Sequence, residues 1–233
     1  GDFGYVHLRD FYTDAEEARS LDLLFLEQYN KMRTQGYDGR GLIIDLRLNQ
    51  GGRLDFVDRM LALFVRENVI GYYLQEGDGE RTPIRIRPAG RIEDDPIVIL
   101  IDEKTDAGAV LFAAVMRLRR NSLVLGHHSG KHGIVHGLIP YRRNHLISVP
   151  DRYMIGPDES NLHGVGIAPV GDAYRVNEAL RTSTSDDSAE SFEAIRRQYA
   201  ASERIFRSLI AEGAVNDPLI ARAIALMNTR VTR

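Results

Sequence analysis

The chain has 233 residues, of which 43% are hydrophobic, and its 30 Lys and Arg against 33 Asp and Glu give a formal net charge of −3. This composition is ordinary for a globular protein with a sizeable core. The balanced charge provides no field to attract nucleic acid or an anionic membrane, and no apolar run reaches the ~20 residues of a membrane-spanning helix. Because the sequence lacks Cys, disulfides, thiolate zinc sites and cysteine nucleophiles are excluded. We expect no binding of nucleic acid and no membrane insertion.

Apolar strands and amphipathic helices alternate through most of the chain. The periodicity predicts strands at residues 5–8, 41–47, 96–101, 123–125 and 146–149, a hairpin of 72–74 with 84–87, and helices at 20–32, 54–64 and 108–119. Segments 41–47 and 96–101 are almost continuously apolar, which is typical of strands covered on both faces. The order favours an α/β fold, with a mixed β-sheet core and flanking helices over residues 1–175.

The remaining residues, 176–233, follow a polar stretch. Residues 182–191 are rich in Ser, Thr and Asp, as in a linker, and helical periodicity returns at 191–211 and 218–227. We expect an α-helical C-terminal tail over 176–233, whose helices are a candidate element for forming a homodimer.

Three loops are expected at one edge of the sheet, after Leu46, Ile101 and Leu125, because parallel strands joined by right-handed crossovers end at the same edge. In the first loop, Gly51 and Gly52 allow backbone N–H groups to approach a ligand or a developing oxyanion, and an ordinary strand-to-helix turn is the alternative. The second, at 105–109, is where a nucleophile usually lies, but Ala107 at its centre offers none. A packed α/β turn is the alternative there.

The third loop, residues 126–137, is rich in Gly and His and is predicted to lack regular structure. Three interpretations of it stay open. His128, His132 and His136 follow at four-residue spacing, which on a helix would align zinc ligands, although the glycines between them disfavour a helix. His132 or Lys131 would instead serve as a general base that faces the other two loops. The third interpretation is a solvated polar loop.

Taken in order, these segments resemble the carboxyl-terminal processing (tail-specific) peptidase family of serine proteases. The most specific match is Gly41-Leu-Ile-Ile-Asp-Leu-Arg-Leu-Asn-Gln-Gly-Gly52, which is similar to the family's G-L-I-L-D-L-R-x-N-P-G-G. Weaker matches are residues 4–8, 96–109, 123–126, 138–140, 152–169 and 217–223. The resemblance covers most of residues 4–227 and implies a fold like that of ClpP and the crotonases. No PDZ segment of the kind that many relatives carry is recognised.

The resemblance also implies a site. Such a peptidase uses a Ser nucleophile, a Lys base and a Gln that holds the Lys. Carried over without gaps, these positions fall on Ala107, His132 and His136, and a slip of one residue would restore Lys131 as the base. The oxyanion donors would be the backbone N–H groups of Gly108 and of Gly51 or Gly52.

The resemblance implies further that the partner is a polypeptide, added as a strand beside the cleft and cleaved near its C-terminal tail. No cofactor is needed, and the location by family analogy is extracytoplasmic, either periplasmic or secreted.

All three side chains of this machinery differ from the family pattern. In one explanation, Ala107 is an engineered or selected replacement of Ser in a peptidase that paired Ser with His132. That pair is chemically sound, because His needs less adjustment of its pKa than Lys to act near neutral pH. In the other, the chain is a natural pseudopeptidase that binds peptides. With Ala107 the chain is expected to form no acyl-enzyme in either case. A His-ligated metal hydrolase is the remaining alternative.

Overall fold

The structure, a computed structural model, describes residues 3–12, 20–90, 92, 94–118, 122–143, 145–169 and 217–231. The chain divides into two compact units, Gly1–Tyr174 and Arg175–Arg233. In the second unit the structure describes helix α5 (Pro218–Val231), which confirms the helix predicted at 218–227. The predicted linker and the helix expected at 191–211 lie outside the described residues.

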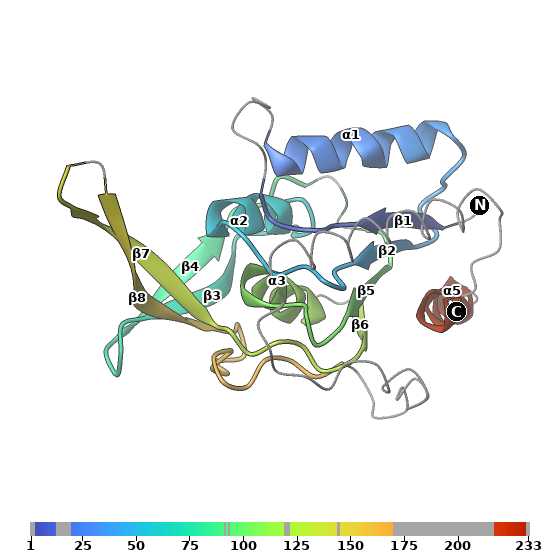
Figure 1. The fold of residues 1–233 in the computed structure, drawn as a ribbon. Helices are drawn as coiled ribbons and strands as arrows, with labels where there is room; N and C mark the ends of the chain where they lie inside the picture. The colour runs from blue at the N-terminus through green and yellow to red at the C-terminus, as the bar shows by residue number, and fades with distance from the viewer. Residues whose placement is uncertain are drawn as a thin grey trace. The chain divides into compact units, whose positions relative to one another are not determined.

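Apart from β7, the strands and helices of the first unit follow the predicted order, and their ends mostly lie within a few residues of those expected (Figure 1). The strands are β1 (Gly4–His7), β2 (Leu42–Asp45), β3 (Val69–Gln75), β4 (Arg81–Ile86), β5 (Ile97–Ile101), β6 (Ser122–Gly126), β7 (Ile134–Tyr141) and β8 (His145–Ile155). The helices are α1 (Leu21–Thr34), α2 (Leu54–Ala62) and α3 (Ala107–Arg117). None of the described helices is both long and apolar enough to cross a bilayer.

The strands form two four-stranded sheets. The first has the order β1-β2-β5-β6, and all of its neighbours are parallel. The second has the order β4-β3-β8-β7 and is antiparallel. The predicted α/β class with a mixed β-sheet core and flanking helices is therefore confirmed.

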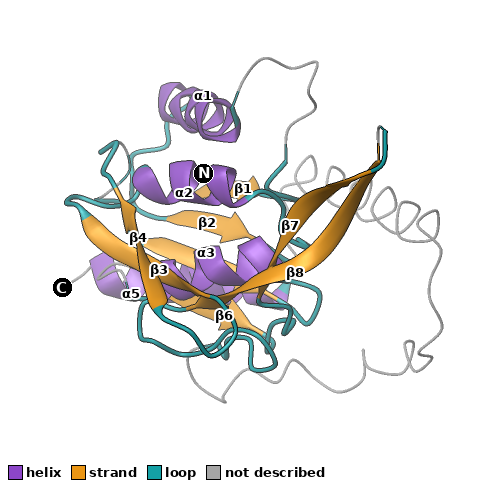
Figure 2. Cartoon of the chain, turned by 90° about the vertical axis from the view of Figure 1, so that its left-hand side faces the viewer, coloured by secondary structure: helices purple, strands orange, loops and turns teal. Residues whose placement is uncertain are grey.

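Helices α2 and α3 lie between the two sheets and share a core with both (Figure 1, Figure 2). Phe64, next to the end of α2, packs edge-on against Phe25 of α1 and Phe112 of α3, with ring centroids 5.8 and 6.0 Å apart. Ile99 of β5 and Tyr72 of β3 bring the two sheets into the same cluster. Removal of each such side chain from water stabilises the fold by about 1.5–3 kcal/mol, which fixes the helices on the sheet that carries the loops.

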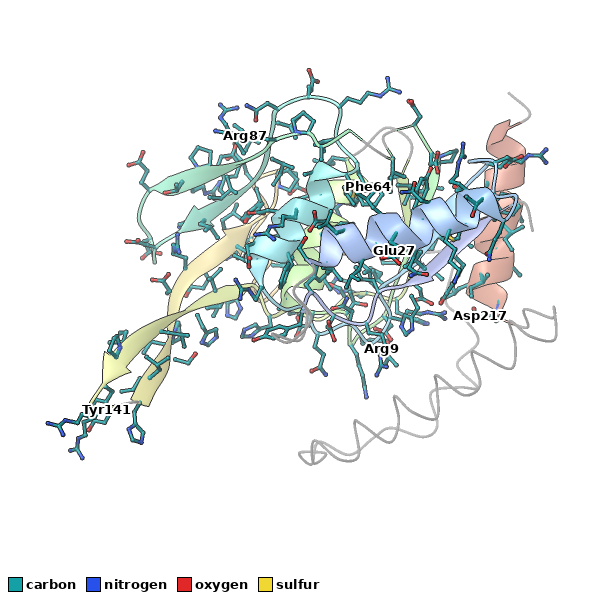
Figure 3. The ribbon with its side chains drawn as sticks, turned by 90° about the horizontal axis from the view of Figure 1, so that it is seen from above. Arg9, Glu27, Phe64, Arg87, Tyr141 and Asp217 are labelled. Atoms are coloured by element: carbon teal, nitrogen blue, oxygen red, sulfur yellow. The ribbon has the colours of Figure 1, made fainter. Side chains whose placement is uncertain are left out.

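The β7–β8 hairpin corrects the sequence analysis. The segment 126–137 was expected to lack regular structure, but β7 begins at Ile134, and β8 extends well beyond the predicted 146–149. Pairing decides this, because Ile134 lies opposite Tyr153 and Gly137 opposite Val149, and a local pattern that includes glycine cannot reveal such distant partners. Figure 3 shows the hairpin extending away from the helices of the first unit, with Tyr141 at its far end.

Candidate active site

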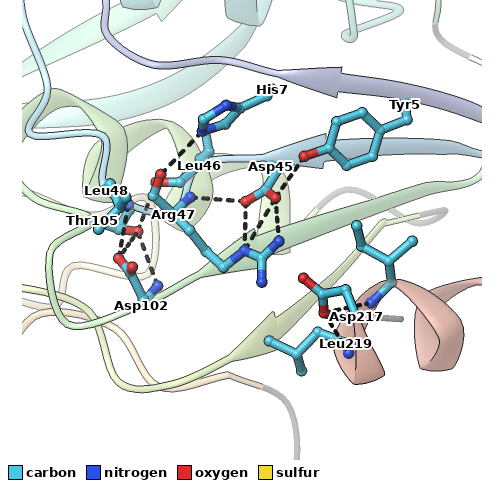
Figure 4. Close-up of polar contacts among 11 residues, drawn as sticks. Tyr5, His7, Asp45, Leu46, Arg47, Leu48, Asp102, Thr105, Asp217 and Leu219 are labelled. Atoms are coloured by element: carbon cyan, nitrogen blue, oxygen red, sulfur yellow. Dashed lines mark hydrogen bonds and ion pairs between the residues drawn. The ribbon is translucent and has the colours of Figure 1, made fainter. Parts of the chain in front are cut away.

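The loops that follow β2 and β5 are joined by hydrogen bonds at the carboxyl edge of the parallel sheet. Thr105 Oγ1 donates to the carbonyl of Leu46 at 2.8 Å, and the Asp102 carboxylate accepts from the N–H of Leu48 at 3.1 Å (Figure 4). The N–H of Asp106 donates to the carbonyl of Asn49 at 2.8 Å. As predicted, these two loops therefore meet at one edge of the sheet.

Beneath this junction, a buried carboxylate fixes the start of the first loop. Asp45 accepts from Arg47 Nη2 at 2.5 Å, from Arg47 Nε at 2.9 Å and from the Tyr5 hydroxyl at 2.8 Å (Figure 4). Burial, together with the charge of Asp45, raises the pKa of Tyr5 above its usual range, so the phenol stays a donor. The Asp-Leu-Arg part of the signature thus has a structural role here.

Ala107 begins α3 and lies against the glycine turn of the first loop. Its φ of 46° is in the left-handed region, which is uncommon for a residue with a β-carbon. A Cβ on Gly51, whose φ is 95°, would lie 2.8 Å from the Cβ of Ala107 and 2.6 Å from the nitrogen of Gly108. Only glycine allows the two turns to approach this closely.

Backbone N–H groups surround this point. The N–H of Gly51 donates to Asn49 Oδ1 at 2.8 Å and is therefore already engaged. Those of Gly52 and Gly108 have no acceptor in the part of the chain that the structure describes. They lie at the N-terminus of α3, whose dipole favours negative charge. The arrangement is suited to hold an oxyanion next to position 107.

Asp106 ties the third loop to the second. Its Oδ1 accepts from the N–H of Ala107 at 3.0 Å and from the N–H of His132 at 2.8 Å. The N–H of Gly130 donates to the carbonyl of Thr105 at 2.8 Å. The sequence analysis assigned no role to Asp106, although an Asp directly before an apolar helix is a recognisable N-cap signal. Asp106, the residue before position 107, therefore holds the backbone of His132 close to that position.

The imidazole of His132 belongs to a group of rings. It stacks on His136 with centroids 5.6 Å apart and meets His163 edge-on at 6.2 Å. His136 lies on β7, with its Nδ1 3.3 Å from Ser148 Oγ, and His163 Nδ1 accepts from the N–H of Gly133 at 3.4 Å. The structure thus brings His132 and His136 together, and adds His163, which lies in the matching segment 152–169 but for which the sequence suggested no role. The side chain of Lys131 is exposed.

The three histidines of the zinc hypothesis do not form a metal site. The ring of His128 is exposed, and its Nδ1 lies 3.1 Å from the carbonyl of Ser129. Within the described ranges, no group of three or more His, Cys, Asp or Glu side chains is placed to hold a metal ion. The four-residue spacing would align these side chains only on a helix, but His132 lies in a loop and His136 on a strand.

The chain matches the model of Peptidase family S41 over residues 2–170. It is 28% identical over 131 residues to a probable CtpA-like serine protease of Staphylococcus haemolyticus, covering 56% of this chain and 26% of that protein. It is 23% identical over 169 residues to the carboxy-terminal-processing protease of Bartonella bacilliformis, covering 72% of this chain and 38% of that protein. The chain thus matches well under half of the length of these relatives.

A solved structure has the same fold at low sequence identity. The photosystem II D1 C-terminal processing protease aligns with a TM-score of 0.61 and 18% identity, covering 72% of this chain and 41% of that one. The family model spans all three loops that meet around Ala107, together with both sheets. The chain therefore belongs to peptidase family S41, the serine-type carboxyl-terminal processing peptidases that its segments resemble.

Proposed function

We propose that the site around position 107 binds extended polypeptide and that, with serine at this position, it hydrolyses the polypeptide through an acyl-enzyme. The observation that carries the proposal is the pair of unengaged N–H groups, of Gly52 and Gly108, at the point where the glycine turn of the first loop lies against residue 107. One such donor is worth roughly 2.7–4 kcal/mol of transition-state stabilisation in acyl transfer.

In the serine form, the hydroxyl at 107 would attack the scissile carbonyl while its proton passes to a base. The oxyanion would be held by Gly52 and Gly108, since the N–H of Gly51 already donates to Asn49. Collapse of the intermediate would expel the amine, which takes the proton from the base, and leave the acyl group on the serine. Water, deprotonated by the same base, would then release the new carboxyl end.

We assign the base to His132 and its orientation to His136. The support is that Asp106 holds the backbone of His132 close to position 107 and that the ring of His136 stacks on it. His136 would therefore position the base by packing instead of the hydrogen bond that a Gln would provide. Lys131 is the alternative base, because a shift of one residue along this loop exchanges the two.

With Ala107, the chain has no nucleophile at this site and would bind polypeptide without cleaving it. A peptide-binding or scaffold role is thus the second candidate, and Ala107 itself favours it. In both cases the ligand is an extended polypeptide.

The test is the Ala107→Ser variant, assayed for cleavage of an unstructured polypeptide and for labelling by a fluorophosphonate. We expect both activities to appear in Ala107→Ser, and both to be lost in Ala107→Ser/His132→Ala. Labelling that survives His132→Ala but disappears with Lys131→Ala would assign the base to Lys131. A folded Ala107→Ser protein that neither cleaves nor is labelled would refute hydrolysis and leave the binding role.

A further inference from the structure

The β7–β8 hairpin has an unusual concentration of exposed apolar side chains. Of the nine large hydrophobic residues that are exposed in the described ranges, five lie on this hairpin. Their exposed fractions run from 42% for Ile147 to 64% for Leu138, and the others are Ile139, Tyr141 and Leu146. A contiguous apolar surface of this kind usually marks a binding site.

The apolar side chains cover both faces of the hairpin. Ile139 lies opposite Ile147 in the ladder, and Tyr141 follows two residues later on the same face. Leu138 and Leu146 lie on the other face, since neighbouring residues of a strand point to opposite sides. A partner that packs on one face alone would leave half of these side chains in water.

Within the described part of the chain, no strand pairs with the outer edge of β7. β7 is the last strand in the order β4-β3-β8-β7, and its eight residues include no Asp, Glu, Lys or Arg. Pro140, one residue before its end, has no N–H, so the stretch that can donate to an added strand is Ile134–Ile139. Natural edge strands usually carry such charges to prevent unwanted pairing. The strand begins two residues after His132 and contains His136, so its edge leads away from the proposed site toward the end of the hairpin.

Positive charge gathers at that end. Arg142 and Arg143 form the turn, and the guanidinium of Arg142 lies 5.2 Å from the ring centre of Tyr141. Neither makes an ion pair with any carboxylate of the described segments. The chemistry that complements them is an acidic side chain.

We propose that β7 is a docking edge for a polypeptide strand that has several successive apolar residues flanked by acidic side chains. An added strand would direct alternate side chains to the two faces, so only a continuous apolar run would use Leu138 on one face and Ile139 with Tyr141 on the other. The acidic residues would meet Arg142 and Arg143. A second copy of this chain pairing through the same edge would bring no carboxylate from β7 to these arginines. The proposal rests on the proposed function and names its polypeptide class.

Binding is tested with the chain as it stands, in which Ala107 prevents cleavage. The probe is a fluorescein-labelled, end-capped peptide with about five apolar residues between two Glu-Glu pairs, followed by fluorescence polarisation. We expect Arg142→Glu/Arg143→Glu and Leu138→Thr/Ile139→Thr each to weaken binding about tenfold. The matched control, Arg85→Glu/Arg87→Glu, makes the same charge change at the opposite edge strand β4 and just beyond it, and is expected to leave binding unchanged.

Four further peptides test the geometry. Replacing the Glu pairs by Lys, or every second apolar residue by Ser, should weaken binding about tenfold. N-methylation of alternate residues should abolish binding in one register and spare it in the other, because alternate N–H groups of a strand point to opposite edges. Equal binding of both N-methylated peptides would overturn the proposal.

The same variants test whether the hairpin binds a different partner, either a second copy of this chain or a membrane surface. A chain that sediments as a dimer and becomes monomeric in Leu138→Thr/Ile139→Thr, with no change in peptide binding, would make the hairpin a self-interface and overturn the proposal. If Leu138→Thr/Ile139→Thr instead lost binding to phosphatidylglycerol vesicles while its affinity for the peptide stayed unchanged, the hairpin would be a membrane-binding surface, and the proposal would again be overturned. If Ala107→Ser cleaves the Glu-flanked peptide and the hairpin variants do not raise its KM, the docking edge is wrong and hydrolysis stands. If the peptide binds as expected but Ala107→Ser is inert, hydrolysis is wrong and the docking edge stands.

Discussion

Replacing Gly51 by alanine should push the glycine turn of the first loop away from the start of α3, which it touches. The new β-carbon would lie 2.6 Å from the nitrogen of Gly108, 2.8 Å from the Cβ of Ala107 and 3.1 Å from the carbonyl oxygen of Asp106. The positive φ of 95° costs alanine about 1–2 kcal/mol, and crowding against backbone, which cannot rotate away, costs about 1–3 kcal/mol more. We expect Gly51→Ala to lower the free energy of unfolding by about 2–5 kcal/mol.

Urea denaturation measures this loss, and Gly36→Ala is its matched control. Gly36 has nearly the same φ, 99°, but nothing lies within 4 Å of the position of its added Cβ. Its loss, about 1–2 kcal/mol, is therefore the backbone cost alone. The difference between the two variants isolates the contact between the turn and α3. Equal losses in both would show that the close approach of Gly51 to Gly108 does not exist and would remove the basis of the oxyanion assignment.

Three other predictions concern the bonds that join the loops and the buried phenols. Asp106→Ala should cost about 1–2 kcal/mol as a lost N-cap and should speed hydrogen exchange at the amide of His132, whereas Asp106→Asn, which keeps the oxygen, should restore most of both. Unchanged exchange in Asp106→Ala would contradict the tether. Thr105→Val should lower the free energy of unfolding by about 1–3 kcal/mol in urea denaturation, because the N–H of Asp102 loses its acceptor and the carbonyl of Leu46 loses one of its two donors, and a neutral result would argue against the junction. Burial raises the pKa of Tyr72 above its ordinary value near 10, so the folded state keeps a proton that the unfolded state releases. The contribution of Tyr72 to the free energy of unfolding is complete below pH ~10 and is lost at about 1.4 kcal/mol per pH unit as the pH rises further. In Tyr72→Phe the free energy of unfolding should therefore fall less steeply with pH above ~10, and an unchanged slope would contradict this.

The parallel half of the fold follows from local sequence. Segments 41–47 and 96–101 are apolar at almost every position, as buried parallel strands require, and helical periodicity lies between them. The handedness of the crossovers then places the loops after Leu46 and Ile101 at one edge, where the structure joins them through Thr105. Chain order and chirality are enough to bring these loops together.

What sequence reasoning could not find depends on distant partners. β7 is a strand because Ile134–Tyr141 pairs with β8, and the local pattern around His132 gave the opposite expectation. The contact between Asp106 and His132 joins residues far apart in sequence, and the positive φ of Ala107 is set by its neighbours. Each of these is a tertiary effect that propensity alone does not encode.

Ala107 keeps a backbone geometry that its methyl group does not require. Alanine at the start of a helix adopts a negative φ without cost, so a φ of 46° costs about 1–2 kcal/mol. Its neighbours hold it in place, since Asp106 Oδ1 accepts its N–H and Gly51 lies so close that a Cβ there would be 2.8 Å from the Cβ of Ala107. Strain of this kind concentrates where function needs a defined position. Because the same neighbours would hold any small side chain at 107, a serine hydroxyl adds one oxygen to a β-carbon that already lies against Gly51 at the start of α3, and we expect the restored nucleophile to need no rearrangement of the backbone.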